Sequence, residues 1–175
     1  MSAKNNILDA AASLAASEGI TALGVERIVQ AAGVSKGSFF YHFATKEEMI
    51  RALFKHVAER CISEVDEAVA NGARFTDAFI EMVVRDLRDK GELIAVIVAT
   101  VALDPSLRAV LTAHSEDLRK RMIKEDALSE EQADLLRLVI DGVMIGTVLY
   151  EPEGKLERIE SAKRVLCWIL RETVD

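Results

Sequence analysis

The stretch Ile28-Val-Gln-Ala-Ala-Gly-Val-Ser-Lys-Gly-Ser-Phe-Phe-Tyr-His-Phe-Ala-Thr-Lys46 decides the fold. It predicts two short helices, over about 25–32 and 36–43, joined by a turn at Gly33. Glycine suits that place because it tolerates the positive φ of a sharp turn. Ser35 is placed to cap the second helix. This pattern is typical of a helix-turn-helix, which presents its second helix to the DNA major groove.

The second helix of this motif has two predicted faces. We expect the two helices to pack together through four side chains, Ile28, Ala31, Phe39 and Phe43. The opposite face carries side chains that can donate hydrogen bonds, namely Lys36, Ser38, Tyr41 and His42. Gly37 lets the backbone approach phosphate or base edges closely.

Helical signals extend through the rest of the chain. Apolar spacing and breakers predict further helices over about 5–18, 45–69, 76–90, 92–103, 105–124, 129–150 and 155–172, nine in all. Two four-residue patterns, Thr45-Lys-Glu-Glu48 and Ser129-Glu-Glu-Gln132, predict capping boxes, and Thr76 is a third candidate cap. Over 92–103 a strand is the alternative, because β-branched residues abound there.

The predicted fold class is therefore all-α. A three-helix DNA-binding head would occupy residues 1–47, and a long helix would join it to a helical body for effector binding and dimerisation over residues 48–175. Half of the 175 residues are hydrophobic but only 5% are aromatic, which favours helices packed through small and branched aliphatic side chains.

Composition also limits the location of the protein. No apolar run approaches the ~18 residues of a membrane helix, and the N-terminus lacks the apolar core of a signal peptide. Cys61 and Cys167 are far apart and belong to no metal-binding pattern, as expected of thiols in a reducing compartment. The sequence predicts a cytoplasmic protein without a membrane partner or cofactor.

Net charge is −7 and unevenly distributed. Residues 1–56 contain six Lys or Arg and five Asp or Glu, whereas the remainder holds 16 basic and 24 acidic residues. Since the head is close to neutral, we expect modest non-specific DNA affinity that geometry or dimerisation must supplement.

These motifs resemble a known family. Ile7-Leu-Asp-Ala-Ala through Glu18-Gly19, followed by Ile28-x-x-Ala-Ala-Gly-Val-Ser-Lys-Gly-Ser-Phe-Phe-Tyr-His-Phe-x-x-Lys-Glu-Glu-Met49, is similar to the N-terminal domain of TetR-type transcriptional regulators. The resemblance implies a dimeric repressor that a small molecule releases from a palindromic operator. It also implies seven DNA-contacting residues, Lys36, Gly37, Ser38, Tyr41, His42, Thr45 and Lys46.

Two positions depart from the family's pattern. The family commonly has Tyr where this chain has Phe40, so one phosphate-binding hydroxyl is missing. The hydroxyl residue common before the second helix is replaced here by Leu23-Gly24. Glycine can begin a helix but offers no side chain to DNA.

The body predicts a dimer interface. The helix over about 133–150 is apolar nearly all round and must be covered on every side. Gly142 and Gly146 lie four apart, where a second helix can approach closely. The predicted interface is formed by Leu138, Gly142, Ile145, Gly146, Leu149, Ile159, Leu166 and Ile169. The alternative is that these side chains form the core of a monomer.

The same body is the expected place of an effector pocket. Its candidate lining residues are Phe79, Met82, Val83, Val98, Val101, Leu111, His114 and Met144, with His114 as a polar anchor. Few polar residues interrupt these stretches, which favours a hydrophobic or amphipathic effector. Core packing without a pocket is the alternative for each.

Other classes of function remain as alternatives. The chain has no Gly-rich phosphate loop, no Gly-x-Ser-x-Gly and no His-Glu-x-x-His, so we predict that it is not an enzyme. The rival to a DNA-binding regulator is a helical small-molecule-binding or scaffold protein whose head no longer reads DNA.

Overall fold

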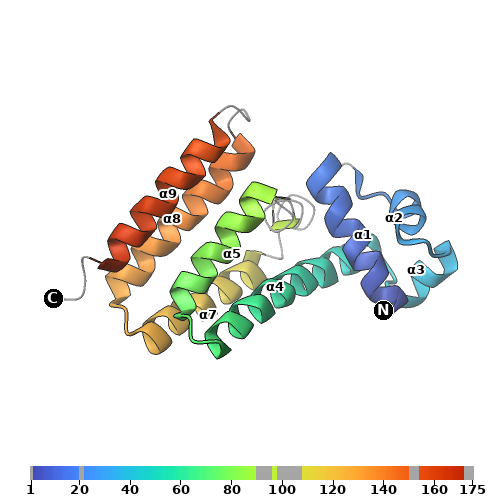
Figure 1. Cartoon of the computed structure of the whole chain (residues 1–175). Helices are drawn as coiled ribbons and strands as arrows, with labels where there is room; N and C mark the ends of the chain where they lie inside the picture. Colours follow the sequence, from blue (N-terminus) through green and yellow to red (C-terminus); the bar gives the residue numbers. More distant parts are fainter. Residues whose placement is uncertain (1, 20–21, 90–95, 98–107, 150–153, 172–175) are drawn as a thin grey trace. The chain divides into compact units, whose positions relative to one another are not determined.

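The computed structural model describes residues 2–19, 22–89, 96–97, 108–149 and 154–171, in which every regular element is helical. Its bounded helices are α1 (Ala3–Glu18), α2 (Val25–Ala32), α3 (Lys36–His42), α4 (Lys46–Ala70), α5 (Phe75–Asp89), α7 (Arg108–Asp126), α8 (Glu130–Leu149) and α9 (Lys155–Arg171) (Figure 1). Val96 and Ile97 are also helical, which favours helix over strand at these two residues; the rest of 92–103 lies outside the described residues. The all-α prediction is confirmed.

The chain divides into two compact units. The first contains Met1–Arg60 together with Lys90–Leu111, and the second contains Cys61–Asp89 together with Thr112–Asp175. Residues of α4 belong to both units. The predicted end of the DNA-binding domain after residue 47 stays a prediction.

The first unit is built on three mutually contacting helices, α1, α2 and α3. Ser2 begins α1 by accepting a hydrogen bond from the Asn5 backbone N–H at 3.3 Å. The apolar residues of α1 lie on one face, which is buried, and Ile7, Ala11 and Ala15 are almost fully shielded from solvent. Small alanines on that face allow α2 and α3 to pack close to α1.

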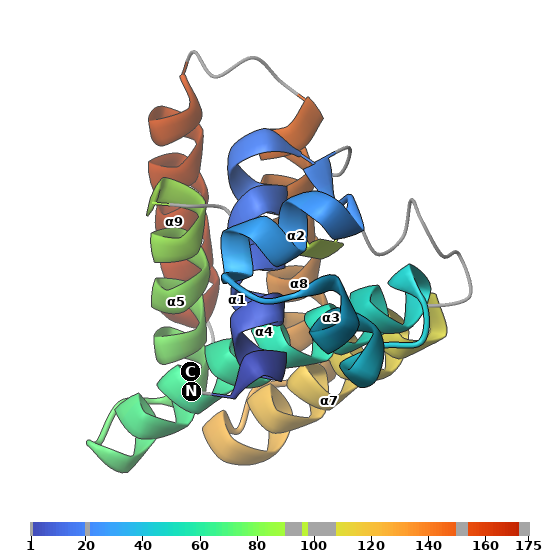
Figure 2. The ribbon, with the colours of Figure 1, turned by 90° about the vertical axis from the view of Figure 1, so that its right-hand side faces the viewer.

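In the second unit, α5, α8 and α9 contact one another in pairs. Figure 1 shows α8 and α9 side by side, and in the view of Figure 2 α5 overlaps α9, which it contacts. Eight of the 15 residues of α5 are buried, and all but Thr76 are apolar, so the helix presents one broad apolar face to its neighbours. At the edge of this contact, Lys163 pairs with Glu81 at 2.5 Å and Arg88 pairs with Glu160.

The N-terminus of α5 is capped by a residue distant in sequence. The Asp126 carboxylate accepts hydrogen bonds from the backbone N–H groups of Phe75 (3.2 Å) and Thr76 (2.6 Å). The prediction that Thr76 caps this helix is therefore wrong. Thr76 lies inside the first turn and is fully buried. A carboxylate at this end also complements the helix dipole.

Polar contacts also fix α7 beside α8. Ser129 and Gln132 form the predicted capping box, each side chain accepting a hydrogen bond from the other's backbone N–H. Arg119 on α7 donates to Asp134 at 2.6 Å and to Glu130 at 3.0 Å. Its hydrogen bond holds the pKa of Asp134 below the ordinary value.

Within the part of the chain that the structure describes, no helix is both long enough and apolar enough to cross a membrane.

Candidate nucleic-acid interface

The turn between α2 and α3 has the geometry that the sequence predicts. Gly33 adopts φ 65° and ψ 32°, a left-handed conformation that side chains disfavour. Its N–H bonds the Gln30 carbonyl and the Val34 N–H bonds the Val29 carbonyl, so two free carbonyls at the end of α2 are satisfied. Ser35 then caps α3 by accepting from the Ser38 backbone N–H at 3.0 Å.

Apolar contacts hold α3 in place. Ile28, Phe39 and Phe43 are buried, as predicted, and the Phe39 and Phe43 rings lie 5.7 Å apart. Ala31 is exposed, so its assignment to this packing is wrong. It lies three residues after Ile28, but it borders a surface hollow that residues of α1 also line.

The outward face of α3 differs in part from the prediction. Lys36, Gly37 and Tyr41 are exposed, with Tyr41 at 84%. Ser38 and His42 are half-buried, so they lie at the edge of the face. Phe40 is 48% exposed and lies within the face, where the sequence pattern indicated only a missing hydroxyl. A helical wheel could have found it, since positions 36, 37, 40 and 41 share one side.

Charge on this surface is partly neutralised within the unit. Lys36 Nζ lies 3.4 Å from a carboxylate oxygen of Glu26 on α2. Arg27 is 2.7 Å from Glu18. Both are solvent-exposed ion pairs, which are worth little and exchange readily for a phosphate. Among the described residues, no acidic side chain pairs with Lys46.

The start of α4 places a second cation beside the motif. Thr45 accepts a hydrogen bond from the Glu48 backbone N–H at 3.1 Å, as predicted. The Glu48 carboxylate, however, accepts from the Ala44 N–H at 2.9 Å and not from Thr45, so the reciprocal half of the box shifts by one residue. Lys46 is the first residue of α4, where the helix dipole also attracts anions.

A further cation beside the motif was not predicted from the sequence. Lys4, in the first turn of α1, holds its ammonium 5.9 Å from the centre of the Phe43 ring. That distance is within the range of cation–π attraction. The contact brings a positive charge next to Phe43, the C-cap residue of α3. A spacing of 39 residues gives no local signal for it.

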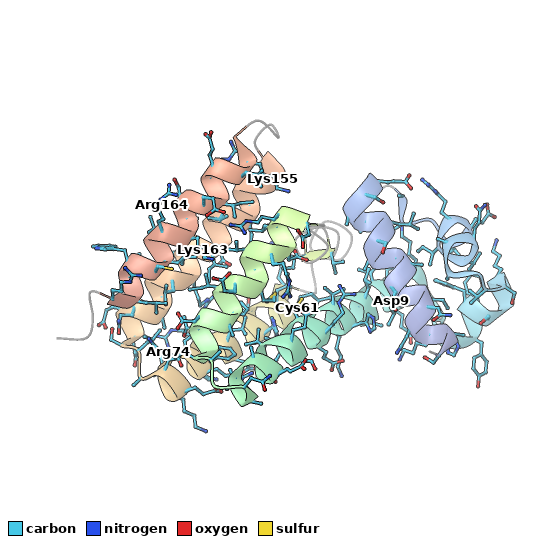
Figure 3. All side chains as sticks on the ribbon, in the orientation of Figure 1. Asp9, Cys61, Arg74, Lys155, Lys163 and Arg164 are labelled. Atoms are coloured by element: carbon cyan, nitrogen blue, oxygen red, sulfur yellow. The ribbon has the colours of Figure 1, made fainter. Side chains whose placement is uncertain are left out.

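Charged contacts join α4 to α1 in the same unit. His56 Nε2 lies 2.8 Å from an Asp9 carboxylate oxygen, and Arg60 lies 3.8 Å from the same oxygen. Asp9 is on α1 (Figure 3). The contacts fix the first half of α4 against the three-helix head.

Comparison with known proteins places this geometry in a family. A model described as bacterial regulatory proteins of the tetR family matches residues 7–53, and a model of the tetracyclin repressor-like C-terminal domain matches residues 73–160, half of the chain. The chain belongs to the TetR family of transcriptional regulators. Members of such a family are generally not enzymes.

A curated relative supports this assignment to the family. The HTH-type transcriptional repressor KstR2 of Rhodococcus jostii (strain RHA1) is 35% identical over 69 residues, covering 39% of this chain. In that match the chain spans 34% of the length of the relative.

Solved structures share the fold across nearly the whole chain. SCO4454, a TetR-family transcriptional regulator from Streptomyces coelicolor, has TM-score 0.76 and 22% identity and covers 99% of this chain and 90% of its own. The multidrug binding protein EbrR, complexed with malachite green, has TM-score 0.67 and 22% identity. The match covers 95% of this chain and 96% of EbrR.

The TetR-type body exposes apolar side chains on its last two helices. On α8, Leu138 is 69% and Ile145 is 53% exposed, Gly142 is exposed and Gly146 is half-buried. The side chain of Leu149 lies outside the described residues. Leu135 and Leu156 on these helices are exposed as well, and two further exposed apolar residues, Val165 and Trp168, had no signal in the sequence.

The predicted interface on α9 needs correction. Ile159, Leu166 and Ile169 are each less than 5% exposed, so they are core residues of this chain and offer no surface to a partner. One-sided periodicity identified the apolar stripe of α9 correctly. It could not tell whether the stripe faces α5 and α8 or a second copy, because both are apolar surfaces.

The predicted pocket residues of the body are mostly buried. Phe79, Met82, Val83 and Met144 are each less than 9% exposed, and Leu111 and His114 are half-buried. Val98 and Val101 lie outside the described residues. Burial lowers the pKa of His114, against an opposing effect of Asp117.

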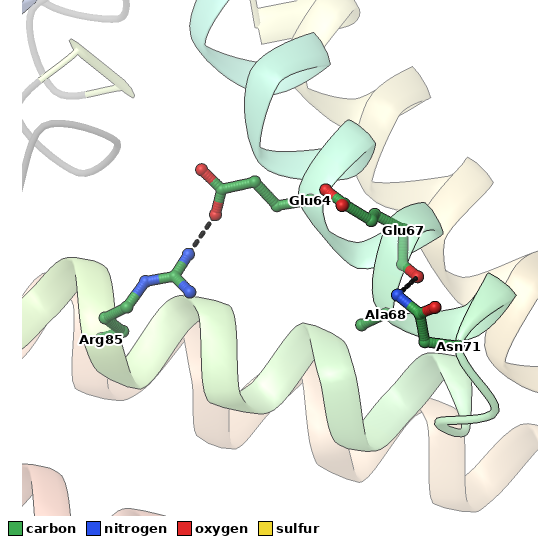
Figure 4. A pocket seen from close by; sticks show the side chains of 5 residues that line it. All are labelled: Glu64, Glu67, Ala68, Asn71 and Arg85. Atoms are coloured by element: carbon green, nitrogen blue, oxygen red, sulfur yellow. Dashed lines mark hydrogen bonds and ion pairs between the residues drawn. The ribbon is translucent and has the colours of Figure 1, made fainter.

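Two surface hollows are described elsewhere in the regulator. One, of about 420 Å³, is bordered by Glu64, Glu67, Ala68, Asn71 and Arg85. Figure 4 shows the Glu64–Arg85 ion pair across it and the Asn71 amide donating to the Glu67 carbonyl. The other, of about 450 Å³, is lined by residues of α1 and by the end of α2. None of the predicted effector residues lines either of these two hollows.

Proposed function

We propose that this protein is a ligand-responsive transcriptional repressor, released from a palindromic operator by a small hydrophobic or amphipathic effector. The observation that carries the proposal is the outward face of α3. Lys36, Gly37 and Tyr41 are exposed on a helix whose cap, turn and buried Phe39 fix its orientation. Such a helix offers donors to base edges and phosphates while the core stays intact.

Phosphate contacts would come from the ends of helices around this face. Lys46 begins α4, Thr45 directly precedes it, and His42 ends α3. Ser38 is half-buried beside Ser35, so its role would be a contact at the edge of the face. These residues, with those of α3, form the proposed DNA-binding set.

Dimerisation is part of the proposal. Leu138, Ile145 and Trp168 expose apolar surface on α8 and α9, and an apolar surface of this kind favours association. Two copies would form a four-helix interface, a common arrangement in symmetric dimers. Two recognition helices about one DNA turn (~34 Å) apart would then bind a palindrome jointly, which adds affinity that a near-neutral head lacks.

Effector release is supported by relatives and by the apolar body. KstR2 is named a repressor, and EbrR is a multidrug binding protein solved with malachite green. We infer a similar class of ligand here, bound among α5, α7 and α8, with the half-buried His114 as a polar anchor. A cytoplasmic location belongs to the same proposal.

The first experiment is a mobility-shift assay with the full chain and the DNA upstream of its own gene. A sequence-specific complex is expected at low salt, and it should weaken when the correct effector is added. Absence of any specific complex at low salt would reject the repressor and favour the rival, a helical ligand-binding protein whose head no longer reads DNA. Phe40 and the uncapped Gly24 are the observations that favour this rival.

A second experiment addresses the phosphate contact of Lys46. Lys46→Ala should weaken binding to all sequences and reduce the slope of log K against log salt by about 1. Lys55→Ala is the matched control, because Lys55 is exposed on the same helix but pairs with Glu59. Equal slopes for the two variants would reject the role of Lys46.

A third experiment addresses the dimer. Leu138→Glu places a charge on the exposed apolar face of α8 and should yield a monomer in sedimentation velocity without lowering the helix content. Gly146→Leu should weaken the same contact by blocking close approach of a second helix. Lys55→Glu is the charge control on α4. A dimer that survives Leu138→Glu would contradict the proposed interface.

A further inference from the structure

Phe40 is an exposed aromatic ring in the middle of the surface that the proposed function turns toward DNA. It is 48% exposed, although phenylalanine gains free energy when its ring leaves water. Its neighbour Phe39 is fully buried, so the hydrophobic contact that holds α3 is complete without Phe40. An apolar ring left outside a complete core is available for a contact with another molecule.

The ring is held in a defined orientation. The Phe39 and Phe40 centroids are 5.3 Å apart with the planes at 80°, an edge-to-face contact. Phe40 follows the capped first turn of α3, whose backbone is fixed by Ser35. A positioned ring loses little conformational freedom on binding, which favours a specific contact over a general apolar one.

The residues around Phe40 leave room for a flat partner. Gly37 precedes it by one helical turn, and a Cβ at Gly37 would meet only Ser35 Oγ, at 3.7 Å. Lys36, four residues before Phe40, supplies positive charge on the same side of the helix. Tyr41 follows with a hydroxyl on an 84% exposed side chain. The face therefore has an apolar centre between two polar groups.

We propose that Phe40 is a specificity-determining residue that contacts the C5-methyl group of a thymine in the major groove. Of the groups that base pairs present there, the thymine methyl is the apolar one, and phenylalanine is among the side chains that contact it. The absence of a hydroxyl then changes what this position recognises, because the ring distinguishes a base where a tyrosine would bind a phosphate. This inference rests on the proposed function.

The experiment begins with the full chain and a library of random DNA duplexes, from which the preferred duplex is selected. Each thymine of that duplex is then replaced by deoxyuridine, which removes only the methyl group. At one thymine of each half-site, the wild-type affinity should fall about fourfold, which corresponds to about 0.8 kcal/mol for one buried carbon. For Phe40→Ala, the same replacement should change nothing.

Matched variants separate the possible outcomes. Phe40→Ala should stay folded, because the core holds Phe39 and Phe43 without it. Lys46→Ala should keep the thymine preference while binding more weakly. Two results would overturn this inference alone. In one, a duplex is selected but no deoxyuridine replacement lowers the affinity of the wild type. In the other, the replacement lowers the affinity of Phe40→Ala as much as that of the wild type. Failure to select any duplex would reject the proposed function and the inference with it.

Discussion

The three-helix head and the helical body are built from the same kinds of residue but are specified differently. The head is defined by signals within a few residues of one another: Ser35 caps the helix that it precedes, and Gly33 ends the one that it follows. The body is held by distant partners. Asp126 caps α5 from 50 residues away, and α5 contacts α9 across a still longer separation.

The two regions also expose different chemistry. The outward face of α3 combines Lys36, Phe40 and Tyr41, a mixture suited to the polar and methyl groups of a DNA groove. Helices α8 and α9 expose several large apolar side chains among their charged ones, including Leu138 and Trp168, which suit another protein surface. In the proposed function, the first region reads a DNA sequence and the second pairs two copies of the chain.

The largest expected effect separates neighbouring phenylalanines of the head. Phe39→Ala should cost about 3–5 kcal/mol of unfolding free energy, because it empties a fully buried site. Phe40→Ala should cost less, about 1 kcal/mol, because only a half-exposed ring and its edge contact with Phe39 are lost. Urea unfolding followed by circular dichroism measures both, and Trp168 fluorescence reports on the body alone. Equal losses for the two variants would contradict the assigned faces of α3.

The next largest effect is expected at Asp126, which caps α5 in the body. Asp126→Ala should cost about 1–2 kcal/mol, because the N–H groups of Phe75 and Thr76 lose their acceptor. Asp126→Asn is the control, since its amide oxygen can still accept one of these bonds. The loss should appear in the unfolding transition of Trp168 fluorescence. If Asp126→Ala, Asp126→Asn and the parent have the same free energy of unfolding, the cap does not contribute to stability.

A smaller effect is the pH dependence of stability that His114 of the body causes. The pKa of His114 is lowered by burial from 6.5, so the folded protein binds fewer protons than the unfolded chain in the window below about pH 6.5. Unfolding free energy should therefore fall as pH drops from about 6.5 toward the lowered pKa. His114→Gln should remove that part of the dependence. Urea midpoints at several pH values compare the two, and parallel curves would exclude His114 as the cause.

The smallest effect tests the local signals of the head. Gly24 begins α2 with φ −83° and no side-chain cap, and a Cβ there would meet open space. Gly24→Ser should stabilise the head by a few tenths of a kcal/mol, whereas Gly33→Ser should cost about 1–2 kcal/mol at its positive φ. Thermal unfolding of the two variants gives the comparison. Destabilisation by both would contradict the local account.

The same contrast explains what the sequence could predict. Ser35, Gly33 and the Ser129–Gln132 box follow from chemistry within four residues, and the structure has all three. Thr76 fails as a cap because a stronger acceptor arrives from α7. For Ile159, Leu166 and Ile169, periodicity shows that a face is buried but not what covers it. The exposure of Phe40 does not follow from its apolar character, but a helical wheel that puts Phe39 and Phe43 on the packed side puts Phe40 on the side of Lys36 and Tyr41.

The most direct test of a DNA-reading head paired by its body is a hydroxyl-radical footprint of the full chain on its selected duplex. Two protected patches are expected, separated by about one helical turn (~34 Å), as two recognition helices on one face require. Leu138→Glu, which leaves the head intact, should weaken both patches together. A single patch that Leu138→Glu leaves unchanged, or no protection at low salt, would contradict a DNA-reading head that the body pairs.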